Sequence, residues 1–276
     1  MDFRCPRCAG TGNWSTKRAL MMYPHCGHQV SVTAGTIIHR SHLPLRTWFR
    51  AIWLIANQKH GISVLGLQRL LDLGNYKTAW SCLQKLRRAM VRSDRDRLIG
   101  HVEVDETYAG GVEPGGDRRH LGNKVLVVVA AQAEGKRIGR IRLSSMPDTS
   151  SQSLLSFVQS AIEPGSTVIT DGWEGYEGLS GRGYKHKVIS GSGKTVSALL
   201  PRVHLVASLL KRWLLGIHQG VVSREQLDYY LDEFTFRFNR RTSKSRGKFF
   251  YRLVEQAVAI EPVPFSRSVT SRNHHK

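Results

Sequence analysis

The sequence predicts an α/β protein in which a mixed sheet with flanking helices follows a cysteine-containing segment and a helical segment. Residues 100–218 alternate apolar runs of strand length with helical repeats, which is typical of a sheet covered by helices. Residues 44–92 carry apolar side chains at helical spacing, and residues 1–40 are rich in Cys, His and Gly. We therefore predict domains at 1–40, 41–98 and 99–220, a C-terminal helical extension at 221–260 and a disordered tail at 261–276.

Charge indicates the class of partner. The 276 residues include 41 Lys and Arg against 21 Asp and Glu, a formal net charge of +20. Residues 1–99 hold 16 basic and 4 acidic residues, residues 100–199 hold 11 of each, and residues 200–276 hold 14 and 6. Basic regions on both sides of a neutral one favour a nucleic-acid partner; a basic soluble protein without one is the alternative.

Composition excludes two classes of protein, the secreted disulfide scaffold and the membrane protein. Four cysteines are too few for a disulfide framework in a chain of this length, which indicates a reducing compartment. The longest apolar runs, such as Val125–Ala131, are too short to cross a bilayer, and no signal peptide opens the chain. We expect a cytoplasmic protein with no membrane partner.

The helical segment predicts a helix-turn-helix. Pro44 suits a helix start, Gly61 ends the first helical run, and Ile62–Leu73 can form a second helix before a turn at Gly74-Asn75. A third helix begins near Tyr76. Its inward face consists of Ala79, Leu83, Leu86 and Met90, and its outward face of Lys77, Ser81, Lys85 and Arg88. The outward face predicts DNA contacts in a major groove; the alternative is a helical bundle with a solvated face.

The alternating part predicts strands and helices in turn. Strands are expected at 101–105, 124–132, 136–143, 167–170 and 185–189, and helices at 149–162 and 203–215. Asp148 or Ser150 is the expected cap of the first of these helices. This order predicts a mixed α/β sheet.

Two aspartates end predicted strands. Asp105 closes the run Val102-Glu103-Val104-Asp105, and Asp171 follows Val168-Ile169-Thr170. Strand ends are where ligands bind in such sheets, and two carboxylates placed together repel each other unless a cation lies between them. Two Mg²⁺ ions held in this way are the usual device for phosphodiester cleavage. Glu103 and Glu106 border this site, and Glu103, which shares the face of Asp105, is expected to tune or support the metals.

A third ligand is expected on a downstream helix, but residues 178–224 contain no Asp or Glu. His204, Ser208 and Lys211 lie there on one helical face. His204 then faces the metals, where imidazole suits Mn²⁺ better than Mg²⁺, and Lys211 holds a substrate phosphate. A histidine satisfied within its helix is the alternative, and Glu233 with Arg240 is the rival pair at the same spacing.

These residues resemble a known family. The runs Val102–Gly111, Thr170–Trp173, Leu209–Arg212 and Phe234–Arg241 are similar to those of bacterial insertion-sequence transposases with an N-terminal zinc ribbon and an acidic-triad catalytic domain of ribonuclease H type. The resemblance implies a mixed five-stranded sheet and two-metal chemistry with Mg²⁺ or Mn²⁺. It also matches Asp105, Asp171, His204 and Lys211 to catalytic positions, in an Asp-Asp-His version of the triad.

The cysteines of residues 1–40 predict a zinc site. Cys5 and Cys8 form a CxxC knuckle, and Cys26 follows 17 residues after Cys8. Tyr23 stands where the family has a fourth cysteine, so His25 or, better placed, His28 is the expected replacement. The alternative is a degenerate ribbon that binds no metal.

The sequence thus predicts a transposase that binds double-stranded DNA, both the terminal inverted repeats and the target, as a homo-oligomer. Lys194 and Arg212 are further expected DNA contacts; the loop Ser190–Thr195 resembles a phosphate loop but has Val188 where the first glycine is required. A DNA-binding regulator, an inactive transposase remnant and a related nuclease or resolvase are the alternative functions.

Overall fold

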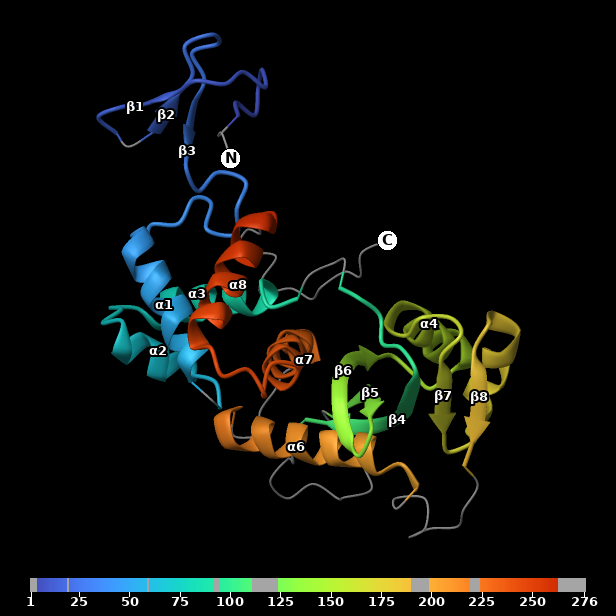
Figure 1. Ribbon diagram of the computed structural model, residues 1–276. Helices are drawn as coiled ribbons and strands as arrows, with labels where there is room; N and C mark the ends of the chain where they lie inside the picture. Colours follow the sequence, from blue (N-terminus) through green and yellow to red (C-terminus); the bar gives the residue numbers. More distant parts are fainter. Residues whose placement is uncertain are drawn as a thin grey trace.

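The computed structural model describes residues 4–18, 20–58, 60–91, 95–110, 124–189, 199–218 and 224–262. A small three-stranded sheet lies at one end of the molecule, a helical group follows it, and a five-stranded sheet with its helices lies at the other end (Figure 1). Within these residues, no helix combines the length and apolar character needed to cross a bilayer. The predicted tail is described only as far as residue 262, and the predicted domain boundaries stay predictions.

The small sheet consists of the antiparallel strands β1 (Trp14–Ser15), β2 (Leu20–Met22) and β3 (Gln29–Ser31) in that order. Its core is small, with Cys5, Tyr23 and Val30 buried together. So small a core supplies little stability by itself, and small domains of this kind commonly use a metal or disulfides in addition.

The helical group contains α1 (Leu45–Asn57), α2 (Val64–Leu70) and α3 (Tyr76–Arg88). Ser63 caps α2 and Asn75 caps α3, each by accepting a hydrogen bond from a backbone N–H of the first turn. The predicted second helix is therefore shorter than 62–73. The apolar face predicted for α3 is buried as expected, because its side chains face α1 and α2.

A distant helix completes the core of this group. α8 (Arg246–Ala259) lies beside α1, and its residues Phe249, Leu253 and Ala257 belong to the same buried cluster as Trp48 and Leu83 (Figure 1). The C-terminal extension therefore supplies part of the helical core, which its position in the sequence does not indicate.

The large sheet has the strand order β6-β5-β4-β7-β8. β4 (His101–Ala109), β5 (Val125–Glu134) and β6 (Arg137–Met146) are antiparallel neighbours, whereas β7 (Thr167–Thr170) and β8 (Lys185–Val188) run parallel to β4 and to each other. This confirms the predicted mixed five-stranded sheet. The first three strands extend beyond the predicted ranges.

Helices cover both faces of the large sheet. α4 (Ser151–Ala161) and the 3₁₀ helix η1 (Glu174–Arg182) pack with Val102 and Val104 on one face. On the other face, α6 (Pro201–His218) and α7 (Arg224–Phe238) pack on β5 and β6 (Figure 1). Because side chains alternate along β4, Glu103 and Asp105 point toward the α6 face.

Candidate active site and metal centre

The strands β4 and β7 bring two aspartates to the same level of the sheet; β4 continues past Asp105 to Ala109, so the prediction that Asp105 ends a strand was wrong. Glu103 pairs with Ile169 in the parallel register, so Asp105 stands level with Asp171, two residues further along each strand. Asp171 follows β7 directly, and its Oδ1 accepts a hydrogen bond from the backbone N–H of Trp173 at 3.1 Å. Two residues predicted from the sequence to share a site therefore lie next to each other.

Helix α6 adds the imidazole of His204 and the ammonium of Lys211 to the two aspartates. His204 Nδ1 lies 3.7 Å from Asp105 Oδ2. Nε2 of the same ring is buried and has no hydrogen-bond partner in the described part of the chain. Lys211 is exposed two helical turns further along α6, and its charge acts on the Asp105 carboxylate. The structure thus brings Asp171, His204 and Lys211, the other three predicted catalytic residues, close enough to Asp105 for their charges to act on it.

The surroundings of Asp105 disfavour its charge. Burial raises the pKa of this carboxyl group above its ordinary value, and the charge of Asp171 adds to the rise. The backbone N–H of Glu106, which donates to Asp105 Oδ1 at 2.9 Å, and the charges of His204 and Lys211 offset only part of it. Additional positive charge at this position would stabilise the ionised aspartate.

This donor set fits a divalent cation. Two carboxylates and an imidazole with one ring nitrogen unengaged suit Mg²⁺ or, because of the imidazole, Mn²⁺. Its three donors are nevertheless spread widely, since no three metal-binding side chains outside the N-terminal cysteines have all their donor atoms within 4.8 Å in the described residues. Repulsion between Asp105 and Asp171 is consistent with this wider spacing.

Glu103 points toward the α6 face, as predicted, but its two oxygens are occupied. Arg202 Nη1 donates to Oε1 at 2.6 Å, and the backbone N–H groups of Arg202 and Val203 donate to Oε2 at 2.7 and 3.1 Å. These are N–H groups of the first turn of α6, which a helix leaves unsatisfied. Glu103 therefore anchors the start of α6 and with it His204, and a role of Glu103 in supporting the metals stays a prediction.

Glu106 lies on the opposite face of β4 from Asp105. Its Oε1 accepts a hydrogen bond from the hydroxyl of Tyr176, which is fully buried in η1. Burial raises the pKa of Glu106 to about 7; the charges of Asp105 and Asp171 add to the rise, and the Tyr176 hydrogen bond opposes it. Tyr176 was missed by sequence reasoning, because a single tyrosine in a glycine-rich stretch carries no periodic pattern.

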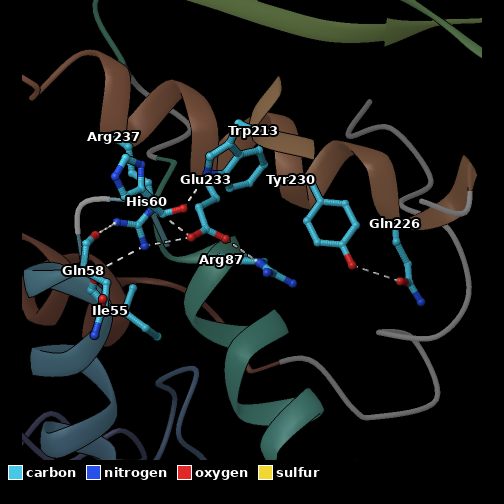
Figure 2. A network of polar contacts seen from close by, with 9 residues as sticks. All are labelled: Ile55, Gln58, His60, Arg87, Trp213, Gln226, Tyr230, Glu233 and Arg237. Atoms are coloured by element: carbon cyan, nitrogen blue, oxygen red, sulfur yellow. Dashed lines mark hydrogen bonds and ion pairs between the residues drawn. The ribbon is translucent and has the colours of Figure 1, made fainter. Parts of the chain in front are cut away.

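The rival pair Glu233 and Arg240 does not form a second site of this kind. The Glu233 carboxylate is fully buried between Arg87, at 2.7 Å, and Arg237, also at 2.7 Å (Figure 2). Both oxygens of Glu233 are thus occupied by arginines of the chain, and Arg240 stacks over the ring of Phe236 at 4.0 Å.

The three cysteines of the small sheet lie together. The sulfur atoms of Cys5, Cys8 and Cys26 are all within 4.8 Å of one another, and the sulfurs of Cys5 and Cys26 are 3.5 Å apart. His28 does not belong to this group. Tyr23, at the position of the missing cysteine, is buried in the same small core. Three thiols in this arrangement suit a structural zinc ion with one further ligand.

The predicted DNA-contacting residues differ in exposure. Lys77 is exposed at the start of α3, whereas Ser81, Lys85 and Arg88 are half-buried. Lys85 Nζ lies 6.0 Å from the centre of the Trp48 ring, and burial lowers the pKa of its ammonium. Arg212 is exposed on α6. Lys194 lies outside the described residues.

Comparison with known proteins found a matching family and a similar protein. Residues 97–239 match the family described as ISXO2-like transposase domain. An uncharacterised protein in transposable element ISH50 of Halobacterium salinarum (strain ATCC 700922 / JCM 11081 / NRC-1) is 28% identical, over 88% of this chain and 87% of that protein.

Two solved structures with low similarity were also found. The Mos1 strand transfer complex is 13% identical over 84% of this chain and 79% of that chain, with a TM-score of 0.33. The pre-cleavage Mos1 transpososome is 12% identical over 82% of each chain, with a TM-score of 0.32.

Proposed function

The chain belongs to the ISXO2-like transposase domain family, and from this premise we propose that it is the DNA transposase of an insertion sequence. The reaction is phosphoryl transfer: a phosphodiester bond is hydrolysed at each end of the element, and the freed 3′ hydroxyl then attacks target DNA. The protein acts inside the cell, where both DNA substrates lie.

Asp105, Asp171 and His204 are the proposed ligands of two Mg²⁺ or Mn²⁺ ions. The observation that carries this proposal is the parallel register of β4 and β7, which sets the two aspartates level, with His204 3.7 Å from Asp105. Such ions activate the attacking oxygen and stabilise the leaving oxygen. Lys211, on the same face of α6 as His204, holds a phosphate of the substrate strand. Glu103 and Arg202 keep α6, and therefore His204, in register with β4.

DNA recognition is assigned to the helical group and to basic residues near the site. Exposed Lys77 at the start of α3 supports base or phosphate contacts by that helix at the terminal inverted repeats, with Ser81, Lys85 and Arg88 along the same helix. Arg212 and Lys194 contact the DNA backbone near the cut. Two element ends must be held together during strand transfer, so the active species is a homo-oligomer on DNA.

The test separates cleavage from binding. Asp171→Asn and Asp105→Asn should each lower Mn²⁺-dependent cleavage of a terminal-repeat duplex by at least roughly a hundredfold, because each change removes a negatively charged ligand. Binding of the same duplex, measured in EDTA by fluorescence anisotropy, should be retained. Lys77→Ala should give the opposite result, with weaker binding.

Each alternative function has its own outcome in this assay. Cleavage that survives either aspartate change would reject the assigned site. Wild-type protein that binds the repeat and never cuts it would favour a DNA-binding regulator or an inactive remnant. Cutting of branched DNA without joining of ends would favour a resolvase.

A structural zinc ion is proposed for the small sheet. The clustered sulfurs of Cys5, Cys8 and Cys26 support it, with His28 as the proposed fourth ligand after rotation of its side chain. Zinc analysis of purified protein should find one equivalent per chain, which Cys8→Ser removes; His28→Ala should weaken zinc retention against chelator. Wild-type protein that retains no zinc would show a degenerate ribbon, with no consequence for the aspartate site.

A further inference from the structure

A second concave site lies where the helical group meets the large sheet. Its volume is about 630 Å³, and it is lined by the end of α3, the start of the segment leading to β4, the edge strand β6 and the C-terminal parts of α7 and α8. Its charged lining residues are five arginines and two acids: Arg95, Arg140, Arg142, Arg240, Arg252, Asp96 and Glu255. No residue of the proposed catalytic site is among them.

Arg142 shows how strongly positive this pocket is. Its side chain is only 4% exposed, and its guanidinium donates to the backbone carbonyls of Ile141, at 2.9 Å, and Asp96. Burial and, to a smaller extent, the charges of Arg95 and Arg140 lower the pKa of Arg142 to about 10, against the opposing charge of Asp96. A buried cation surrounded by like charges is costly, and an anion in the pocket would offset that cost.

The two acids of the pocket do not supply this compensation. Arg140 Nη1 lies 3.5 Å from Asp96 Oδ2, and Arg252 Nη1 lies 3.1 Å from Glu255 Oε2. Arg140 is half-buried, and the other three side chains of these pairs are exposed to solvent, where ion pairs contribute little and are screened by salt. Two carboxylates at the rim therefore leave a net positive pocket.

The pocket lies beside β6, the edge strand of the large sheet, whereas Asp105 lies on the central strand β4. Asp105 pairs with Val129, whose side chain packs against the α6 face. Arg142 pairs with Ala130, which belongs to the core on the α4 face. Cross-strand partners point to the same face, so Arg142 points away from the face that carries Asp105, and no residue of the proposed catalytic site lines the pocket.

We propose that this arginine-lined pocket binds phosphodiester groups of duplex DNA at a distance from the cleavage site. The proposal rests on the proposed function for its choice of DNA as the anion. Guanidinium groups pair with phosphate oxygens through two parallel hydrogen bonds, and several arginines around one hollow match consecutive phosphates of a strand. The site lies between the end of α3 and the sheet, so DNA held there bridges the recognition helix and the catalytic domain.

The test compares two double variants of equal charge. Arg140→Gln with Arg252→Gln removes two pocket guanidiniums that are at least partly exposed, and Arg182→Gln with Lys185→Gln removes two exposed charges from η1 and β8. Affinity for a labelled duplex is measured in EDTA over a range of salt concentrations. The pocket variant should bind about tenfold more weakly at low salt, with a salt slope lower by roughly 2, one per lost phosphate contact. The control variant should change by less than about twofold.

A site-resolved measurement accompanies the affinities. Modification of arginines by phenylglyoxal, read by mass spectrometry, should slow at Arg140 and Arg252 when duplex is present and stay unchanged at Arg182. Equal affinity losses in both double variants, or equal modification rates with and without DNA, would overturn the proposal. Because these measurements involve no cleavage, DNA protection of the pocket in a protein that never cuts DNA would refute the proposed function and leave the pocket assignment standing.

Discussion

Two carboxylates of this protein, the buried Glu233 and the half-buried Asp105, have opposite electrostatic surroundings. Glu233 on α7 lies between Arg87 and Arg237; burial alone would raise its pKa, but the two guanidiniums lower the pKa to about 2. Asp105 on β4 has a second aspartate as its neighbour, and its pKa is raised. The chain supplies two arginines as counter-charges at Glu233, whereas at Asp105 the charges of His204 and Lys211 offset the rise in pKa only in part. A cation from solution is the proposed remaining counter-charge at Asp105.

Glu233, the carboxylate paired with two arginines, has a structural role. Arg237 also donates to the backbone carbonyls of Gln58, at 2.6 Å, and Ile55, at 3.2 Å, which lie at the end of α1 (Figure 2). Arg87 belongs to α3, so one carboxylate connects two helices of the helical group to α7. Gly61 also lies close to the Glu233 carboxylate. Its φ is +93°, and a Cβ at this position would lie 2.9 Å from Glu233 Oε1.

The largest effect on stability is therefore expected at Glu233. Glu233→Gln leaves two arginines without their counter-charge, Arg87 fully buried and Arg237 nearly so, and should lower the free energy of unfolding by about 3–5 kcal/mol in urea titrations. Glu163→Gln is the matched control, because its pair with Arg97, at 4.0 Å, is exposed; its loss should be below about 1 kcal/mol.

The pH dependence of the wild type gives a second measurement of the Glu233 contribution. The folded pKa lies below the unfolded one, so the stabilisation is present above the ordinary glutamate range and is lost as the pH falls toward about 2. The Glu233→Gln variant should lack this part of the acid transition. If Glu233→Gln lowers the free energy of unfolding no more than Glu163→Gln does, the two arginines around Glu233 contribute little to stability.

The smallest effect on stability is expected at Asp105. Asp105→Asn removes one of two repelling carboxylates, so the free energy of unfolding should change by less than about 1 kcal/mol or rise slightly. Mn²⁺ should raise the melting temperature of the wild type by mass action and leave that of Asp105→Asn nearly unchanged. A destabilisation as large as that of Glu233→Gln would identify Asp105 as a structural residue and break the contrast.

Elements with a strong local pattern could be predicted from the sequence. The inward face of α3, the strand β7 and the position of Asp171 directly after it follow from apolar periodicity and from turn residues. Both aspartates could be singled out because each follows an apolar run, although β4 continues past Asp105 to Ala109. The three clustered cysteines follow from their spacing.

Long-range pairing could not be read in this way. Glu103 was expected beside the metals because it shares a face with Asp105, but Arg202, nearly a hundred residues away, occupies its oxygens. The hydrogen bond between Tyr176 and Glu106 and the pair between Arg87 and Glu233 likewise join residues whose local sequences give no sign of a partner.

The amino-acid sequence determined which chemical groups the protein has available: aspartates that follow apolar runs, a helical histidine with a lysine two turns on, a knuckle of thiols and an excess of positive charge. Tertiary structure alone decided which buried charges would be neutralised internally. That choice depends on which distant arginine reaches a given carboxylate, and a Coulomb interaction depends on separation in space, which periodicity along the chain does not encode.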